Sequence, residues 1–388
     1  MTVVTLKKGK ERKVLNGYPW IFSDEIFSVA GDKKNGEICT VFSDSMKFLG
    51  KGFFSSSNIA VRMLVLNDDE IDYNFFYSRV LKAFELRKAI IENLDACRIF
   101  HGEADGVPGL IADKYNDYIV IQLRNVGVEN KKAHIVEAFA KVYAPVGIYE
   151  RSDFETGSAE NIKRNKGVIF GKEPEPTIIV QEHGLKYNVD IINGQKTGFF
   201  FDQKDSRFFV RQFVNKGSIC LDAYTFTGGF AMNMAVSGAK KVYAVDKDEQ
   251  SLEMAKRNVA MNNIENIEFF SGTYEKFIQE YSGEDFDVVI LDPPSLIKKK
   301  EERRKGLDIF KGIVKLIVPK IKANGIVCLC SCAYQADTDM LIEASRMAFE
   351  GTGRSIQMVG FTFQSKDHPY IIQIPESFYL KCVWLKIK

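Results

Sequence analysis

The sequence predicts an α/β protein whose C-terminal half forms a parallel sheet with helices on both faces. Strands and helices alternate from Ser218 onward, a glycine turn follows the first of these strands, and an acid ends the second strand. Such alternation is typical of a parallel sheet covered on both sides. Strands are expected at 218–222, 241–246, 266–270, 286–291, 325–331, 356–361 and 379–387, and helices at Gly229–Ser237, Asp248–Asn262, Tyr274–Tyr281, Leu307–Ile321 and Asp337–Phe349.

The stretch Ser218 to Phe230, SICLDAYTFTGGF, has the pattern of a strand, a turn and a helix start. Glycine lets a backbone approach a ligand, and a helix N-terminus offers unpaired N–H groups. Asp246 ends the next strand about 20 residues later, where a carboxylate can hold ribose hydroxyls. The pattern lacks G-x-G-x-x-G, so we predict a nucleoside ligand without a pyrophosphate, such as S-adenosylmethionine.

Bulk composition indicates an ordinary folded protein. The chain has 388 residues, enough for two or three domains, with 45% apolar residues, 27% charged residues and a net charge of +2. Its seven cysteines form no C-x-x-C pair and its four histidines are scattered, so no metal site is expected. The absence of a signal peptide and of a membrane-length apolar run predicts a cytoplasmic location with reduced thiols.

The N-terminal stretch, Met1 to Leu66, reads as short strands with a dense basic cluster next to the aromatic segment Gly17 to Phe22. The bases of the cluster are Lys7, Lys8, Lys10, Arg12 and Lys13. Interleaved bases and aromatics suit a phosphate backbone with stacked nucleobases. A small β-barrel with a solvated charged rim explains the pattern equally well.

The middle of the chain reads as a small α/β module followed by a hairpin. The module comprises a helix at 73–94, a strand at 118–124, a helix at 129–143 and a strand at 147–151. The segment 177–192 alternates in polarity about His183 and Gly184, which predicts a β-hairpin.

The segment Asn193 to Arg207 precedes the nucleotide strand and mixes glycines, three phenylalanines and polar groups. Gln203 and Arg207 are hydrogen-bond donors beside an apolar cluster, a pairing that suits the wall of a mostly apolar ligand pocket. A connecting loop packed by its aromatics is the alternative.

Two strand ends carry candidate catalytic groups. Asp292 follows FDVVIL and precedes two prolines, which hold it in a stiff turn, although a proline stop after a buried strand gives the same pattern. Cys328, Cys330 and Cys332 share one face of the next strand. We expect Cys328 and Cys330 to be core thiols, and Cys332, past the strand, to be the exposed and reactive one.

The loop Ile297 to Gly306 crowds six bases beside this edge: Lys298, Lys299, Lys300, Arg303, Arg304 and Lys305. Because the net charge of the whole chain is only +2, this local cluster favours a polyanionic substrate. A solvated approach to a helix is the alternative.

Taken together, the motifs resemble the RlmI-type class I methyltransferases, which act on carbon 5 of cytosine in bacterial large-subunit rRNA. GYPWIF with the basic N-terminus looks like a PUA domain, an RNA-binding β-barrel. The other motifs occur in collinear order over nearly the whole chain: GEADGVPGLIADKY, QEHGLKY, GQKTGFFFDQ, LDAYTFTGGF, LDPPSL, SCAYQ and DHPYIIQIPESFYLKC.

This resemblance implies a Rossmann-like, seven-stranded methyltransferase domain at 177–388, including the hairpin 177–192, behind a PUA-like domain at 1–70 and a central α/β domain at 71–176. It implies Cys332 as nucleophile and Asp292 as the carboxylate that contacts the target base. The expected S-adenosylmethionine site comprises Asp222, Tyr224, Thr225, Gly228, Gly229, Phe230, Asp246, Lys247, Thr273 and Asp292, with Gln203 and Arg207 added from the preceding segment.

Within this set, the turn from Tyr224 to Phe230 would hold the methionine end of the cofactor, Asp246 the ribose, and the turn from Ser271 to Tyr274 would border the adenine. Three positions depart from the family pattern. The second serine of the Ser-Cys-Ser motif is Ala333, a second cysteine common after Asp-x-Pro is Ser295, and Gly272-Thr273 stands where an acid is common.

The expected partner is large-subunit rRNA, with no membrane and no metal, and a homodimer is one expected assembly. Three rival functions stay open at this point: methylation of a base nitrogen, non-catalytic rRNA binding by a vestigial methyltransferase fold, and methylation of a small molecule. The basic N-terminal segment disfavours the last of these.

Overall fold

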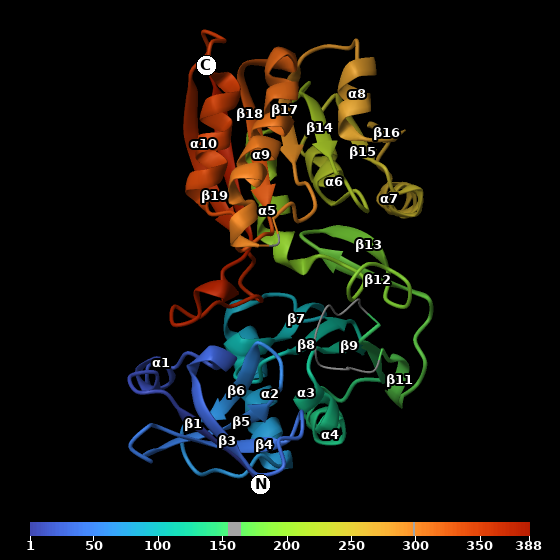
Figure 1. Ribbon diagram of the computed structural model, residues 1–388. Coiled ribbons are helices and arrows are strands. Elements are labelled where there is room, and N and C mark those ends of the chain that lie inside the picture. Colours follow the sequence, from blue (N-terminus) through green and yellow to red (C-terminus); the bar gives the residue numbers. More distant parts are fainter. Residues whose placement is uncertain (154–163, 298) are drawn as a thin grey trace. The chain divides into compact units, whose positions relative to one another are not determined.

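The computed structural model describes residues 1–153, 164–297 and 299–388. The chain divides into two compact units (Figure 1). The first comprises Met1–Val180, Val189–Phe201 and Lys366–Ser377, and the second comprises Gln181–Asn188, Asp202–Ser365 and Phe378–Lys388. The first unit therefore takes in a C-terminal segment that the sequence assigned to the last domain.

One sheet of the first unit has six strands in the order β2-β6-β5-β4-β1-β3. Its strands are β1 (Thr2–Leu6), β2 (Trp20–Phe22), β3 (Ile26–Ala30), β4 (Ile38–Phe42), β5 (Phe48–Phe54) and β6 (Ile59–Val65), and α1 (Glu11–Leu15) follows β1. All neighbours are antiparallel except β1 and β4, and four of the antiparallel pairs contain a register shift. Such bulges bend strands around a small core, here built from Val4, Leu6 and Val41.

The second sheet of the first unit has five strands in the order β11-β10-β9-β8-β7. The elements are α2 (Tyr73–Ile90), β7 (Ala96–His101), β8 (Leu110–Tyr115), β9 (Tyr118–Leu123), α3 (Val126–Asn130), α4 (Lys132–Tyr143), β10 (Gly147–Arg151) and β11 (Lys166–Gly171). Helix α2 starts after Asp72, whose carboxylate accepts a hydrogen bond from the Phe75 N–H at 3.1 Å. It buries Phe76 and Val80 against the sheet, as the helical spacing predicts.

The predicted hairpin is present as β12 (Thr177–Glu182) and β13 (Leu185–Asp190). Its two turn residues, His183 and Gly184, have φ of 49° and 82°. A positive φ at both central positions matches the twist of the flanking strands, which explains why the turn forms there.

The second unit contains a seven-stranded sheet in the order β16-β15-β14-β17-β18-β20-β19. Its strands are β14 (Ile219–Ala223), β15 (Lys241–Asp246), β16 (Ile267–Ser271), β17 (Phe286–Leu291), β18 (Ile321–Ser331), β19 (Ile356–Phe363) and β20 (Lys381–Ile387). Its helices are α5 (Lys204–Phe209), α6 (Gly229–Val236), α7 (Glu249–Met261), α8 (Tyr274–Glu280), α9 (Arg303–Ile317) and α10 (Thr338–Phe349).

Side chains of this sheet alternate between two apolar layers. Leu221 and Val289 face one layer, which also holds Phe310 of α9, whereas Cys220 and Val288 face the other, with α6. In Figure 1, α9 and α10 lie over one face of the sheet. The predicted α/β class with helices on both faces is therefore confirmed.

The expectation of a wholly parallel sheet is wrong at one strand. β20 runs antiparallel to both β18 and β19, whereas β14 to β18 are mutually parallel where they pair. A connection without a crossover helix leads from β19 into β20, and such a connection permits an antiparallel neighbour. The reversal brings the start of β20, opposite Ser331, to the carboxyl edge of the sheet.

Among the described residues, no helix combines the length and the low polarity that crossing a membrane requires.

Candidate active site

The candidate site lies along the carboxyl edge of the parallel strands of the second unit. Asp222 is the penultimate residue of β14, Asp246 ends β15, Asp292 follows β17 and Cys332 follows β18. β14 pairs in parallel with β15 and β17, and β17 pairs in parallel with β18. In open α/β sheets ligands bind outside this edge, so the predicted residues share the expected location.

The Asp222 carboxylate ties the turn after β14 to the first turn of α6. Its Oδ2 accepts hydrogen bonds from the Thr225 hydroxyl at 2.6 Å and from the Ala231 N–H at 2.8 Å. Its Oδ1 is buried and has no hydrogen-bond partner among the described residues. Burial, the largest cause, raises the pKa of Asp222 to about 7, and the nearby Asp246 charge adds to the shift.

The glycine turn has backbone conformations that side chains tolerate poorly. Tyr224, Phe226 and Gly228 all have positive φ, of 64°, 51° and 84°. A Cβ added at Gly229 would lie 2.6 Å from Cδ of Arg207, so this glycine also makes room for the arginine chain. Approach of a ligand to the backbone N–H groups of the α6 N-terminus stays a prediction.

Asp246 organises two loops at the end of β15. Its Oδ2 accepts the Phe226 N–H at 2.9 Å and its Oδ1 accepts the Asp248 N–H at 3.0 Å. Each carboxylate oxygen keeps a second lone pair that a ribose hydroxyl could use. The neighbouring Lys247 is exposed, and Thr273 caps α8 by accepting the Lys276 N–H at 3.2 Å.

Gln203 and Arg207 donate hydrogen bonds to different carboxyl groups. Gln203 lies at the end of the short helix Phe201–Gln203, and its Nε2 donates to Oδ2 of Asp292 at 2.9 Å. The Arg207 guanidinium donates two bonds of 2.7 Å to the Glu182 carboxylate, and both side chains are buried. A cofactor contact by Arg207 stays a prediction, and its ion pair with Glu182 is a partner that sequence reasoning missed.

Asp292 is held where β17 leaves the sheet. Its N–H donates to the Ala223 carbonyl at 3.5 Å, and the two prolines follow. Burial raises the pKa of this carboxyl well above its ordinary value, and the charges of Cys382, Asp202 and Asp222 add to the effect. This shift favours the neutral form of the carboxyl, which can donate a hydrogen bond.

The cysteines separate into core thiols and one partly exposed thiol. All seven lie in described residues; six are buried and Cys332 is intermediate in exposure. Cys328 and Cys330 are fully buried, as predicted, and their sulfur atoms lie 3.5 Å apart. Cys382 joins them, with all three sulfur atoms within 4.8 Å of one another, and burial is the largest cause that raises the pKa of Cys328 and Cys330.

Lys381 was not predicted, although it lies at this edge. It is 3% exposed, and its Nζ donates to the carbonyl oxygens of Ala333 at 3.4 Å and Tyr379 at 3.2 Å. The motif SFYLKC contains Lys381, but its position could not be predicted because the direction of β20 cannot be inferred from the local pattern.

Some side chains of the predicted basic loop are exposed, and others are engaged in contacts within the protein. Lys298 lies outside the described residues. Arg303 donates to the Gln335 carbonyl at 2.5 Å and to the Asp337 carboxylate at 2.6 Å, so it braces the start of α10. Lys299, Arg304 and Lys305 are exposed. Contact of this loop with a polyanion stays a prediction.

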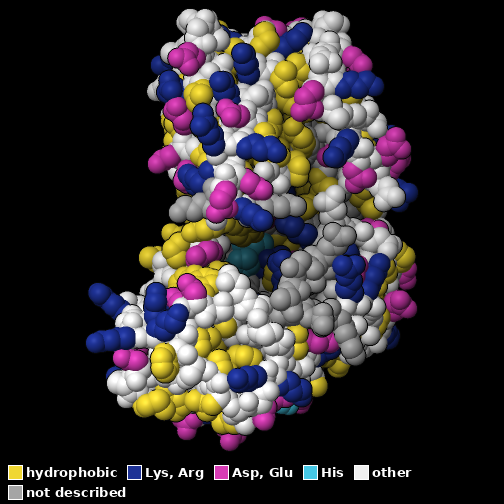
Figure 2. Space-filling model, viewed as in Figure 1, with side chains coloured by type: hydrophobic (Ala, Val, Ile, Leu, Met, Phe, Trp, Pro, Cys, Tyr) yellow, Lys and Arg dark blue, Asp and Glu magenta, His cyan; other side chains and the backbone are white. Residues whose placement is uncertain are grey.

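The N-terminal basic cluster likewise contains both side chains that make contacts within the protein and side chains that are exposed. Lys13 pairs with Glu25 and lies 4.7 Å from the ring centroid of Phe22, and Lys7 donates to the Asp24 carbonyl at 2.7 Å. Lys8 and Arg12 are exposed. Figure 2 shows Lys and Arg side chains projecting around α1.

Comparisons with known proteins show which families the chain resembles. The chain matches the models of a PUA-like domain at residues 4–65 and of a TRM5/TYW2 methyltransferase domain at residues 178–302. It is 33% identical over 386 residues to the ribosomal RNA large subunit methyltransferase I of Enterobacter sp. (strain 638), which covers 97% of both chains. It is 34% identical over 390 residues to the protein of that name from Aliivibrio fischeri (strain ATCC 700601 / ES114), which covers 98% of both.

Solved structures share the fold over the whole chain. A Streptococcus mutans protein described as a SAM-dependent methyltransferase superposes with a TM-score of 0.84 at 20% identity, covering 100% of both chains. A structure described as a methyltransferase complexed with SAH gives a TM-score of 0.86 at 20% identity, again over 100% of both chains.

Proposed function

Because the chain belongs to the family of ribosomal RNA large subunit methyltransferase I, we propose that it transfers a methyl group from S-adenosylmethionine to carbon 5 of a cytosine in large-subunit rRNA. One observation carries the choice of carbon 5. A partly exposed thiol, Cys332, and a buried carboxyl with a raised pKa, Asp292, follow two adjacent parallel strands.

The residues at the strand ends fit the cofactor. The unpartnered Asp222 Oδ1 is a buried acceptor that a bound ligand would satisfy, and the turn from Tyr224 to Phe230 would hold the methionine end. Asp246 and Lys247 would bind the ribose, and Thr273 would border the adenine. When bound, S-adenosylmethionine supplies an electrophilic methyl group on its sulfonium sulfur.

The chain's own residues would make the target carbon reactive. Carbon 5 of cytosine is a poor nucleophile, so the Cys332 thiolate would add to carbon 6 and make carbon 5 enamine-like, which is covalent catalysis. The protonated Asp292 would donate to ring nitrogen 3 and neutralise the charge that develops there. Gln203, bonded to Asp292 at 2.9 Å, would fix the orientation of that carboxyl.

Two conditions follow from this chemistry. The cytosine has to be unstacked or already single-stranded before it can reach the strand ends. After methyl transfer, the proton on carbon 5 has to leave before the carbon–sulfur bond breaks. Ser295 stands where many RNA cytosine methyltransferases have a second cysteine, so water or another base takes this proton.

The test incubates Cys332→Ala with large-subunit rRNA and labelled S-adenosylmethionine. We expect product formation to fall by at least about 10⁴-fold, because no other group replaces the nucleophile. Cys39→Ala, a buried thiol on β4 of the first unit, is the matched control and should keep its activity. Undiminished product from Cys332→Ala would end the claim for carbon 5.

Methylation of a base nitrogen is the rival within the same fold, because that chemistry needs no thiol. RNA containing 5-fluorocytosine separates the two, since a fluorine on carbon 5 blocks release and traps the covalent adduct. A trapped complex in the wild type that is absent in Cys332→Ala supports carbon methylation. Failure to bind S-adenosylmethionine in calorimetry would instead favour a non-catalytic rRNA-binding protein.

A further inference from the structure

A buried lysine lies next to the candidate nucleophile. Because β20 runs against β18, its first residue, Lys381, pairs in register with Ser331, and Cys332 follows directly. Lys381 is 3% exposed, and its Nζ donates at 3.4 Å to the carbonyl oxygen of Ala333, the residue after Cys332. The antiparallel register thus sets the Lys381 backbone opposite the residue before the thiol, and its ammonium group reaches the carbonyl of the residue after it.

The surroundings of Lys381 contain few compensating charges. Its Nζ lies over the rings of Phe378 and Tyr334, at 5.3 and 5.8 Å from their centroids. Asp337, before α10, favours the charged lysine, but its carboxylate is already paired with Arg303 of α9 at 2.6 Å. Among the described residues, Lys381 makes no ion pair within 4.0 Å.

A buried ammonium without a carboxylate partner is unfavourable, since transfer from water costs several kcal/mol unless another charge compensates. Burial accordingly lowers the pKa of Lys381 to about 8, and the Arg303 charge acts in the same direction. The Asp337 and Cys332 charges oppose the shift. The Asp337 carboxylate is shared with Arg303, and the Cys332 charge is the other anion that favours the charged lysine.

We propose that the Lys381 ammonium is the counter-ion of the Cys332 thiolate and thereby keeps the nucleophile ionised before the base arrives. Lys381 is a positioning residue in this scheme, because it acts through Cys332 and touches neither base nor cofactor. The inference rests on the proposed role of Cys332. The alternative is a structural lysine that only links the Ala333 and Tyr379 carbonyl oxygens.

The experiment measures the rate of iodoacetamide alkylation at Cys332 against pH, read by peptide mass spectrometry on the full chain without RNA or cofactor. Only the thiolate reacts, so the pH midpoint of the rate reports its ionisation. The wild type should have a midpoint below the ordinary value of about 8.5. The six other thiols are buried, so they contribute little to the signal.

Lys381→Met removes the charge and keeps most of the length of the side chain. Its midpoint should rise by about one to two pH units, and alkylation at pH 7 should slow about tenfold or more. Lys381→Arg keeps a cation and should stay near the wild type. Lys386→Met, on the same strand but about 16 Å away at 3.3 Å per residue, is the matched control and should not shift.

An unchanged midpoint in a folded Lys381→Met variant would overturn the inference, and so would a wild-type midpoint at or above about 8.5. The second outcome needs no variant, so the test holds even where Lys381→Met fails to fold. The two proposals fail separately. Retained rRNA methylation by Cys332→Ala overturns the proposed function, whereas an unshifted midpoint with an inactive Cys332→Ala overturns the role of Lys381 alone.

Discussion

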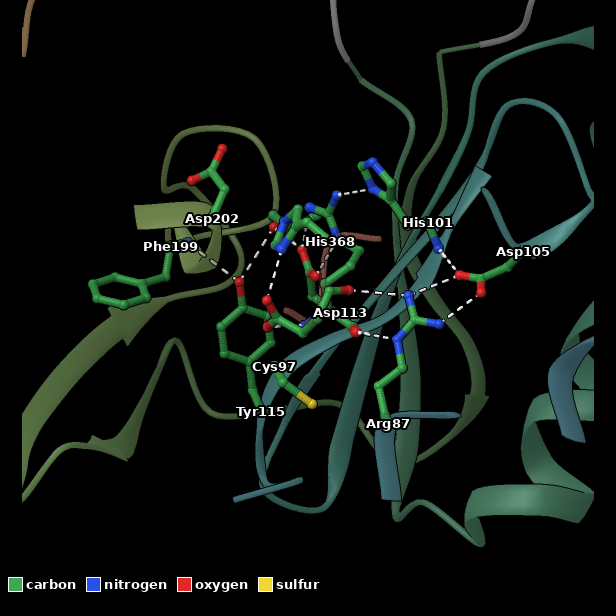
Figure 3. Close-up of polar contacts among 12 residues, drawn as sticks. Arg87, Cys97, His101, Asp105, Asp113, Tyr115, Phe199, Asp202 and His368 are labelled. Carbon is green, nitrogen blue, oxygen red and sulfur yellow. Dashed lines mark hydrogen bonds and ion pairs between the residues drawn. The ribbon is translucent and has the colours of Figure 1, made fainter. Parts of the chain in front are cut away.

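Both units bury carboxylates, and two of those in the first unit, Asp105 and Asp113, meet arginines. Arg87 donates to both oxygens of Asp105, at 2.6 and 2.8 Å, and Arg98 donates to both oxygens of Asp113, at 2.5 and 2.9 Å. Figure 3 shows the first pair, with the Arg87 guanidinium pointing at the Asp105 carboxylate. Such two-pronged contacts compensate the burial of both charges.

Asp222 and Asp292 of the second unit are buried without a comparable cation. Neither makes an ion pair within the described residues, and burial raises the pKa of both carboxyls. An uncompensated carboxyl reduces the stability of the fold. Burial of such a carboxyl is therefore better explained by a role in catalysis than by a role in packing. Carboxyls with perturbed pKa values cluster at active sites.

The paired network also explains a domain assignment. The Arg87 Nη2 donates to the Asp367 carbonyl at 3.0 Å, and the Asp367 carboxylate accepts the Arg98 N–H at 2.9 Å. These bonds fasten the segment Lys366–Ser377 to the first unit. In these first-unit pairs buried charge holds distant parts of the chain together. In the second unit Glu182 is paired with Arg207, but Asp222 and Asp292 have no such cation among the described residues.

The largest expected effect comes from breaking a pair. Arg87→Met leaves the Asp105 carboxylate buried without its partner and removes the donors to the Arg98 and Asp367 carbonyls. The free energy of unfolding should fall by about 3–5 kcal/mol, as for other buried pairs that lose one member. Urea unfolding curves that follow the first unit measure this change in the free energy of unfolding.

Lys88→Met is the matched control on the same helix, because Lys88 is exposed and its loss should change the free energy by less than about 0.5 kcal/mol. The double variant Arg87→Met with Asp105→Leu should recover part of the loss, since it removes the stranded charge. Equal stability of Arg87→Met and the wild type would mean that the pairing contributes no more than an apolar contact.

The second effect should separate function from stability. Asp292→Asn replaces a carboxyl whose raised pKa favours the neutral form, so the free energy of unfolding should change by less than about 1 kcal/mol. Methylation should fall by about 10²–10³-fold, because the amide cannot supply a proton to ring nitrogen 3. Asp339 is an exposed acid on α10, and Asp339→Asn is the control that should change neither methylation nor the free energy of unfolding.

Rates of labelled methyl transfer and urea unfolding curves measure both quantities on the same samples. Methylation within about threefold of the wild type would remove Asp292 from the mechanism. A large loss of stability would instead make it a structural acid like Asp105, and the contrast between the units would disappear.

The positions of the second unit's candidate residues at the strand ends were predicted from the sequence. Asp222, Asp246, Asp292 and Cys332 each follow or end an apolar run with a clear period, so the shared edge follows from the alternation of strands and helices. Helix α6 begins at Gly229 as expected and ends one residue early, at Val236. The local sequence pattern is therefore sufficient to predict a helix or strand whose bounds depend on consecutive residues.

Contacts between distant segments were not readable. Arg207 and Glu182 are 25 residues apart and belong to different elements, so no spacing rule connects them. The direction of β20 depends on how the preceding connection packs, and Lys381 lies opposite Ser331, the residue before Cys332, only because of that reversal. Charges that compensate one another in three dimensions therefore require the fold, even when each residue stands in a recognisable motif.

The smallest of the three effects is a pH dependence specific to Asp222. Its pKa is about 7 in the fold, against about 3.9 in the unfolded chain, so between these values the folded state holds a proton that the unfolded state has released. Stability is therefore highest below about pH 4, falls as pH rises and levels above about pH 7. Between pH 5 and pH 8 this group should cost about 2–3 kcal/mol, at 1.36 kcal/mol per unit.

Asp222→Asn cannot titrate, so subtracting its urea unfolding free energies from those of the wild type at each pH isolates the contribution of this one carboxyl. The difference should shrink toward zero or change sign in favour of the variant as pH rises, because the wild type alone loses stability. In the same variant, S-adenosylmethionine binding should weaken by about tenfold if Oδ1 accepts a bond from the cofactor. Parallel pH profiles for the two proteins would show that Asp222 is compensated after all, as the acids of the first unit are by their arginines.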